Sequence, residues 1–290
     1  KNWQFTGPDG NTTTVDLPHT WNNIDGQDGG NDYWRGSCTY RTHFAAPAFD
    51  PAAQQVWLQF EGVGDSAEVS LNGTEVISHD GGFSTFRADI TALLQADNEL
   101  TVVADNSKND TVYPQKADFT FYGGIYRTVS LLVVSRDNIA LDYYGGPGVQ
   151  ITPTGNGSSA EIRVETKVNG GGSVEVAILD AEGREVLAGS GMDTTLTLDR
   201  PHLWDGVRDP DLYTCVVRLM KDGQAVDEVR QRFGVRSFSV DAKQGFFLNG
   251  RPYPLHGVSR HQDRKGLGNA ITREMHDEDM QLIKEMGANT

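Results

Sequence analysis

The feature that most constrains the fold is a repeated pattern of short alternating strands joined by Asn-Gly turns. Apolar and polar residues alternate over residues 56–60 and 67–71, and Asn72-Gly73 separates the second run from residues 75–77. Asn-Gly tolerates the positive φ angles of a type I′ turn, which joins two antiparallel strands. Such strands continue to about residue 137 with almost no helical periodicity, so the sequence predicts an antiparallel sandwich, and a jelly roll fits its size.

A second series of strands occupies residues 138–236. Alternating positions are apolar in two runs, and Asp222-Gly223 supplies a hairpin turn before residues 225–233; the runs contain Val174, Val176 and Ile178, and Cys215, Val217 and Leu219. The Gly-rich stretches 145–148 and 154–159 are expected to be loops with little packing. About 100 residues of this pattern predict an immunoglobulin-like sandwich.

The pattern changes after residue 238. A hairpin over 247–251 leads to an apolar strand at 255–258, a polar loop and then a helix, with Thr272 as N-cap and Gly287 as the C′ residue. The apolar stripe of this helix consists of Met275, Leu282, Ile283 and Met286. A strand, a loop and a helix form one βα unit, whereas a complete (β/α)₈ barrel takes about 250 residues. We therefore expect a mainly β chain with three domains, namely a jelly roll at 1–137, an immunoglobulin-like sandwich at 138–236 and the truncated start of a TIM barrel at 237–290.

Charge and cysteine content exclude several classes of function. The formal net charge of −15 would repel the phosphates of nucleic acids and anionic membranes. No apolar run approaches the ~20 residues that a membrane-spanning helix needs, and the first residues lack a signal peptide's apolar region. Cys38 and Cys215 lie in different predicted domains, so we expect two buried free thiols. A soluble chain is expected, in the cytoplasm or the periplasm.

Two polar clusters are candidates for a binding site. Residues 259–264 follow the predicted barrel strand, on the edge where the active sites of such barrels form, and Arg260 and His261 could donate hydrogen bonds to sugar hydroxyls there. Alternatively, Arg260 and Asp263 form an ordinary ion pair. In the first sandwich Asp118 precedes three aromatic residues, a combination that can hold a sugar by stacking and hydrogen bonding. Alternatively, those rings are core and Asp118 simply faces solvent.

Two further acidic segments can be interpreted in more than one way. The loop at 25–34, which contains Asn31 and Asp32, could contact a ligand or hold Ca²⁺, although it lacks the EF-hand spacing. Asp277, Glu278 and Asp279 lie near the start of the predicted helix, where the helix dipole favours negative charge. We expect these three carboxylates to be solvated surface.

Six groups of motifs together resemble glycoside hydrolase family 2, whose members carry a jelly-roll sugar-binding domain, an immunoglobulin-like domain and a catalytic TIM barrel. They stand in family order at residues 16–22, 60–63 with 67–73, 122–127, 201–204 with 211–213, 232–236 and 247–252. Residues 257–264, followed by Gly266 and Gly268, most resemble bacterial β-galactosidases. The resemblance implies a retaining β-galactosidase that hydrolyses terminal β-linked galactose. The alternatives are a β-glucuronidase, another family 2 glycosidase, or a stand-alone carbohydrate-binding module.

The same resemblance assigns substrate-binding roles to individual residues. His261 would contact the galactose ring, Arg260 would support the pocket, and Asp118 would bind a galactose hydroxyl, with Asn31 and Asp32 as further contacts. The family's two catalytic glutamates lie on later barrel strands and match no residue here, so the chain alone is expected to be inactive. No cofactor is expected, and any Mg²⁺ or Na⁺ would belong to the barrel region that the chain lacks. The expected partners are a β-galactoside or oligosaccharide and, in a homo-oligomer, further copies of the chain.

Overall fold

The computed structural model describes residues 1–24, 34–114 and 116–290. The chain divides into two compact units, one formed by Lys1–Val134 with Arg260–Met280 and the other by Ser135–Ser259 with Gln281–Thr290. The predicted boundaries at residues 137 and 236 stay predictions.

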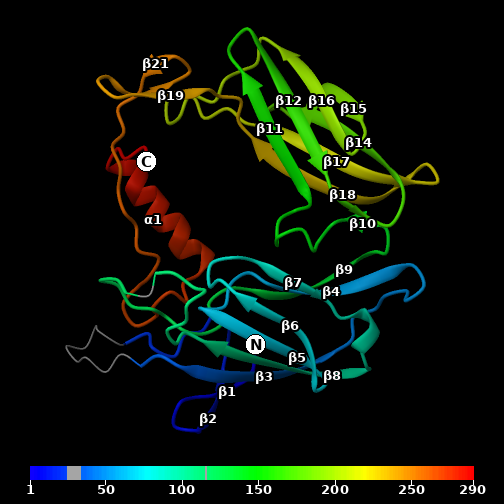
Figure 1. The fold of residues 1–290 in the computed structure, drawn as a ribbon, viewed down its shortest axis with the longest axis vertical. Helices are drawn as coiled ribbons and strands as arrows, with labels where there is room; N and C mark the ends of the chain where they lie inside the picture. The colour runs from blue at the N-terminus through cyan, green and yellow to red at the C-terminus, as the bar shows by residue number, and fades with distance from the viewer. Residues whose placement is uncertain (25–33, 115) are drawn as a thin grey trace. The chain divides into compact units, whose positions relative to one another are not determined.

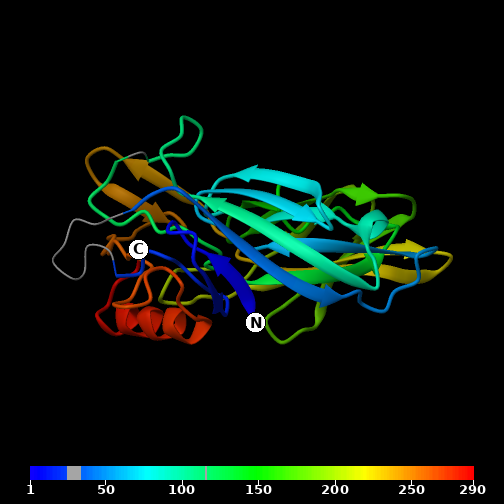
Figure 2. The same ribbon diagram turned by 90° about the horizontal axis from the view of Figure 1, so that it is seen from below.

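The first unit contains a sandwich of two sheets (Figure 1). The larger sheet has the strand order β2 (Thr12–Val15), β1 (Trp3–Thr6), β3 (Ser37–Ala45), β8 (Asp97–Asp105), β5 (Ser66–Leu71) and β6 (Thr74–Asp80). The smaller sheet has the order β7 (Phe86–Asp89), β4 (Gln54–Phe60) and β9 (Val129–Ser135). The long strands β3 and β8 are antiparallel partners and run side by side in Figure 2.

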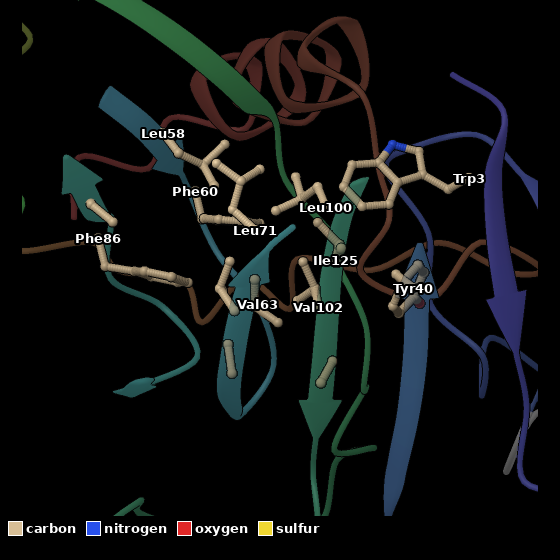
Figure 3. Close-up of a cluster of buried hydrophobic side chains, with 14 of the residues drawn as sticks. Trp3, Tyr40, Leu58, Phe60, Val63, Leu71, Phe86, Leu100, Val102 and Ile125 are labelled. Carbon is tan, nitrogen blue, oxygen red and sulfur yellow. The ribbon is translucent and has the colours of Figure 1, made fainter. Parts of the chain in front are cut away.

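Alternation along the strands builds the core of this sandwich. On β8 every second side chain is buried, including Leu100 and Val102, while β4 contributes Leu58 and Phe60 from the other sheet. Figure 3 shows these side chains gathered with Ile125 in one cluster. Ile125 belongs to no strand, yet it is fully buried, so the segment around it is anchored in the core.

The second unit contains a sandwich with an immunoglobulin-like division of strands. One sheet has the order β11 (Val149–Gly155), β12 (Ser159–Thr166) and β16 (Asp193–Asp199). The other has the order β15 (Glu185–Ser190), β14 (Ser173–Leu179), β17 (Tyr213–Lys221) and β18 (Gln224–Phe233), and a short pair joins β10 (Asn138–Ile139) to β13 (Val168–Asn169). Apolar side chains of both sheets form the core, among them Ile162 and Cys215. The predicted mainly β fold class is confirmed.

The last part of the chain forms a small sheet and a helix. The sheet has the order β19 (Phe238–Asp241), β20 (Gly245–Leu248) and β21 (Arg251–Pro252). The helix α1 (Arg273–Glu285) ends as predicted, because Gly287 has a φ of 84° and the Ala288 N–H donates to the Ile283 carbonyl at 3.2 Å. No residue of α1 is buried, and Leu282 and Met286 are 57% and 68% exposed. Of the predicted apolar stripe, Met275 and Ile283 are therefore half-buried, whereas Leu282 and Met286 are exposed.

Several local predictions are confirmed and others are wrong. Asn72 and Gly73 have φ angles of 52° and 79°, as a type I′ turn requires. The predicted strand at 255–258 is absent; these residues only approach the chain end, where the Val258 N–H donates to the Thr290 carbonyl. The expectation of little packing at 145–148 is wrong for Gly148, which is buried and accepts from the Lys167 N–H at 2.8 Å.

The remaining predictions concern the cysteines and the helix content. Cys38 and Cys215 are free and buried, as predicted, and burial raises the pKa of each thiol to about 12. Apart from α1, regular helix is limited in the described residues to the 3₁₀ turn η1 (Thr91–Leu93). No helix in the described ranges is long and apolar enough to cross a membrane.

Candidate functional site

Asp118 and His261, which are 143 positions apart in the sequence, line the same hollow in the first unit. The hollow has a volume of about 540 Å³ and opens widely to solvent; it is lined by Asp118, Phe119, Thr120, Tyr122, His261, Asp263, Arg264 and Lys265. Both Asp118 and His261 are exposed. The two segments that the sequence singled out separately therefore present their polar groups to one space.

Two contacts join residues 118–122 to residues 261–265, the two segments that line this hollow. The Phe119 ring meets the His261 imidazole edge to face, with the centroids 5.7 Å apart and an angle of 71°. The Tyr122 hydroxyl donates to Asp263 Oδ2 at 3.0 Å. The predicted aromatic run divides into two roles, because Phe121 is buried whereas Phe119 is 38% exposed beside His261. The reading of all three rings as core is thus wrong for Phe119.

Buried asparagines fix the backbone on both sides of Tyr122. The Phe121 carbonyl accepts from Asn22 Nδ2 at 2.9 Å and from Asn106 Nδ2 at 2.7 Å. The Gly123 N–H donates to Asn22 Oδ1 at 3.0 Å. Asn22 and Asn106 are 2% and 0% exposed, so these hydrogen bonds are shielded from water.

Three of the motifs that carry the family resemblance meet at this point. The first contributes the His19 N–H, which donates to the Ile125 carbonyl at 2.9 Å. Directly after residues 60–63 of the second, Gly64 exchanges two hydrogen bonds with Gly124, of 3.0 and 3.3 Å. The segment 121–128 is thereby held on both sides although it lies in no named strand. The motifs at residues 16–22, 60–63 and 122–127, which are far apart in the sequence, are therefore neighbours in the structure.

The loop that carries His261 is held to the sandwich by an arginine and an asparagine. Arg127 Nη2 donates to Gln262 Oε1 at 3.0 Å, and its Nη1 donates to the Asn269 carbonyl at 3.1 Å. Asn23 Nδ2 donates to the Gly266 carbonyl at 2.6 Å. Both residues stand in or beside motifs of the resemblance, but no spacing rule in the sequence could have paired them with residues 135 to 243 positions away.

Arg260 is not one of the residues that line the hollow, and its side chain contacts α1. Its Nε donates to Asp279 Oδ2 at 2.9 Å, and its Nη2 lies 3.1 Å from His276 Nδ1. Arg264 pairs with Asp279 at 2.9 Å and with Glu278 at 2.7 Å. The expected pair between Arg260 and Asp263 is absent. The expectation that these carboxylates are merely solvated surface is wrong for Asp279, whose pKa is lowered chiefly by its hydrogen bond from Arg260.

A charged pair, Arg35 and Asp65, lies next to the aromatic residue Phe121. Arg35 places its guanidinium 4.3 Å from the centroid of the Phe121 ring and 3.7 Å from Asp65 Oδ2. Burial raises the pKa of Asp65 to about 6, and Arg35 partly opposes that rise. Sequence reasoning missed Asn22, Asn106, Arg35 and Asp65 as supports of the site. Asn31 and Asp32 lie outside the described residues, and no group of three or more potential metal ligands occurs among those that the structure describes.

Three family profiles match successive parts of the chain. Residues 27–124 match the glycosyl hydrolase 2 galactose-binding domain-like profile, residues 148–236 the glycosyl hydrolases family 2 profile, and residues 239–290 the profile of the family's TIM barrel domain. Together they cover most of the sequence in one order.

Relatives and solved structures of the same kind align over almost the whole chain. A β-glucuronidase of Bacteroides fragilis is 36% identical, with 99% of this chain and 44% of the relative covered, and a β-galactosidase of Bacteroides ovatus is 31% identical, with 97% and 35% covered. Among solved structures, the FMN-binding β-glucuronidase of Facaelibacterium prausnitzii L2-6 is 41% identical with a TM-score of 0.94, over 100% of this chain and 47% of that one. A putative β-galactosidase of Bacteroides fragilis is 40% identical with a TM-score of 0.93, over 99% and 48%. The chain spans about a third to a half of the length of the curated relatives it matches.

Proposed function

This chain belongs to glycosyl hydrolase family 2, and on that premise we propose that it helps to bind the sugar of a β-glucuronide that the whole protein hydrolyses. The observation that carries the proposal is the convergence of Asp118 and His261 on one open hollow. Two relatives named β-glucuronidase, one of them putative, are 36% and 33% identical, against 31% for two relatives named β-galactosidase. These names support the alternative, a β-glucuronidase, more than the β-galactosidase that the sequence predicts.

One cation of the hollow can bind an anionic sugar, although the carboxylates of Asp118 and Asp263 also line it. Arg264 is already paired with two carboxylates, whereas Lys265 has no ion pair with any described residue. A glucuronide carries a carboxylate where a galactoside carries a neutral hydroxymethyl group. Lys265 can offer that carboxylate a charge-assisted hydrogen bond, and such bonds are roughly twice as strong as neutral ones.

The other lining groups address the ring hydroxyls. Asp118 can accept hydrogen bonds from sugar hydroxyls, and the exposed face of Phe119 can stack on the apolar face of the pyranose. Phe119 also contacts the His261 imidazole, which limits the orientations that the imidazole can take. Positioned donors of this kind accelerate a reaction when their bonds strengthen as the ring distorts toward the transition state.

The chain does not supply the acid and nucleophile of a retaining glycosidase in this proposal. That reaction uses two carboxyl groups about 5–5.5 Å apart on either side of the glycosidic bond. By the family resemblance both are glutamates of later barrel strands. The chain's contribution is substrate binding, and the isolated 290-residue chain is expected to show no turnover of an aryl β-glucuronide above a blank.

The test is to compare aryl β-glucuronide and aryl β-galactoside as substrates of the whole protein. Asp118→Ala should lower kcat/KM about 10- to 150-fold, the effect of losing a hydrogen bond to a charged group worth about 1.5–3 kcal/mol. Lys265→Ala should raise KM for the glucuronide and leave the galactoside unaffected, with Lys108→Ala as an exposed control outside the hollow. Normal kinetics in Asp118→Ala combined with a much lower Tm would show that its carboxylate is structural.

A β-galactosidase is the second candidate, favoured by the 40% identical putative β-galactosidase structure. The same pair of substrates separates the two. Faster cleavage of the galactoside by the whole protein, with no effect of Lys265→Ala on either substrate, would support this candidate and overturn the first.

A further inference from the structure

A second hollow in the first unit shares no lining residue with the one just described. It has a volume of about 530 Å³ and is lined by Phe5, Gly7, Pro8, Asp9, Asn11, Thr13, His19, Thr20, Trp21, Asn22, Asn23 and Trp34. Tyr122 lines the first hollow, and the next residue, Gly123, supports a ring of the second. The two hollows therefore lie against the same firmly held stretch of backbone.

Aromatic rings form a row along the second hollow. Trp34 meets Trp21 edge to face with centroids 6.0 Å apart, and Phe5 stacks on Trp21 at 6.2 Å with an interplanar angle of 17°. His19 continues the row, with its ring 4.8 Å from that of Phe5. Phe5 is buried in the core, whereas Trp34 is 36% exposed. The row is therefore anchored in the sandwich at one end and open to solvent at the other.

Both tryptophans are seated on glycines. A Cβ atom at Gly123 would lie 2.0 Å from Cζ2 of Trp21, and a Cβ at Gly36 would lie 2.5 Å from Cζ2 of Trp34. Any side chain at either position would displace the indole. An exposed tryptophan packed against backbone in this way offers a large flat contact surface to a ligand.

The polar groups of this hollow indicate the class of ligand. Asp9 accepts from the Asn11 N–H at 3.0 Å, and these bonds with Asn11 lower the pKa of its carboxyl, so it is ionised at neutral pH. Burial lowers the pKa of His19 to about 4, so this imidazole is neutral at the same pH. Of the described residues that line the hollow, Asp9 then carries the single formal charge. A carboxylate accepts hydrogen bonds from hydroxyl groups and repels other anions.

We propose that this aromatic hollow is a carbohydrate-binding site for a neutral pyranose, with Trp34 as its stacking surface and Asp9 as its hydroxyl acceptor. An indole face can lie on the apolar face of a sugar ring, and the spare lone pairs of Asp9 can take two neighbouring hydroxyls. The site goes beyond the proposed hydrolysis and does not rest on it. A hollow that contains Lys265 and a hollow whose formal charge is a lone carboxylate would allow one chain to hold a uronic residue and a neutral residue at different places.

The experiment titrates the 290-residue chain with lactose, a neutral probe, and with methyl β-D-glucuronide, an anionic one. The five tryptophans give five indole N–H signals in a ¹⁵N–¹H spectrum. Lactose should shift the signals of Trp34 and Trp21 saturably, with a Kd on the order of 1 mM, as suits one or two rings with few polar contacts. The glucuronide should shift them less at equal concentration, because Asp9 repels its carboxylate.

Variants separate the aromatic contribution from the polar one. Trp34→Ala should weaken lactose binding about tenfold or more. Asp9→Asn should weaken lactose binding about 3- to 10-fold and should reduce the ratio of the affinity for lactose to the affinity for the glucuronide. Phe83→Ala removes an aromatic ring that is 79% exposed and lies outside the hollow, and should change nothing. Asp9 is on the surface, so Asp9→Asn keeps the test valid if Trp34→Ala fails to fold.

Other outcomes overturn the proposal. It fails if lactose causes no saturable shift, if the shifts persist unchanged in Trp34→Ala or Asp9→Asn, or if the glucuronide binds as well as lactose. His261→Ala should leave lactose binding at this hollow intact. Loss of hydrolysis in that variant with lactose binding retained would therefore count for the proposed function, and the two proposals can fail separately.

Discussion

The double hydrogen bond at the Phe121 carbonyl predicts a specific coupling between two buried asparagines. Asn22 and Asn106 donate to the same oxygen, at 2.9 and 2.7 Å. Removing either side chain leaves that oxygen with the other donor, whereas removing both leaves it bare. The cost of the double substitution should therefore exceed the sum of the single costs.

The magnitude follows from the other bonds of each residue. The Gly36 N–H donates to Asn106 Oδ1 at 2.9 Å, and Asn106→Ala removes this acceptor. In the same way, Asn22→Ala removes the acceptor of the Gly123 N–H. A stranded buried donor costs about 1–3 kcal/mol and the lost bond about 1 kcal/mol, so each single variant should lose about 2–4 kcal/mol. The double variant should lose a further 1–2 kcal/mol for the bare Phe121 carbonyl. For a unit of this size each kcal/mol corresponds to about 2–4 °C in Tm.

The assay is denaturant unfolding of the four proteins, followed by tryptophan fluorescence. Trp3, Trp21, Trp34 and Trp57 belong to the first unit and Trp204 to the second, so the signal reports mainly the unit that contains the asparagines. Sucrose at a fixed concentration raises the stability of all four proteins and keeps the double variant folded. Asn156→Ala, at an exposed turn of the second unit, should change stability by less than about 0.5 kcal/mol. Additive losses within that same margin would refute the shared-acceptor argument.

Four further predictions concern stability, pH and local exchange. Gly123→Ala should destabilise the first unit by at least about 2–3 kcal/mol in the same assay, because its Cβ would meet Trp21 at 2.0 Å; Gly171→Ala, whose Cβ meets nothing within 4 Å and which, like Gly123, lies outside the positive-φ region, is the matched control. Burial lowers the pKa of His19 to about 4, so the unfolded state binds more protons than the folded state between about pH 6.5 and pH 4. The free energy of unfolding should therefore fall as pH falls across that window, by about 3 kcal/mol at most. His19→Gln should flatten this dependence of stability on pH, and an unchanged slope would contradict the assignment of the dependence to His19. Burial raises the pKa of Asp65 to about 6, so the folded state binds more protons between about pH 4 and pH 6 and this residue should make stability fall as pH rises; Asp65→Asn should remove that contribution, and a curve identical to wild type would exclude it. Amide protons of α1 should exchange faster than those of β8, since no residue of α1 is buried, and equal protection of the two elements would contradict this.

The fold was largely predictable because its signals are local. Period-two alternation and the turn residues Asn72-Gly73 and Asp222-Gly223 act over a few positions, and both turns have the positive φ angles they imply. The strand predicted at 255–258 failed for the opposite reason. A central barrel strand is stabilised by neighbouring strands, and its apolar composition cannot create those partners within the residues described.

The site was predictable only in part. Asp118 and His261 were found through the resemblance, and they do line one hollow, although their binding role stays a prediction. The partners of Arg260 could not be deduced, since Asp263 is nearer in sequence while Asp279 is nearer in space. Pairing of this kind depends on the path of the backbone, which short-range patterns do not contain. The same holds for Asn106, a residue of no motif whose side chain bonds to the Phe121 carbonyl.

The bond between Asn106 and the Phe121 carbonyl also has a consequence for how this family could diversify. It ties together the two ends of the loop 107–120, which carries Asp118, so the loop is closed at its base, and within the loop Asn109 and Thr111 bond to Ser66 and Asp80 of the sandwich. For a loop whose ends are already joined, doubling the length costs only about 0.6 kcal/mol in closure entropy. Insertions into the loop 107–120 should therefore be able to reshape the rim of the hollow while the sandwich keeps its stability.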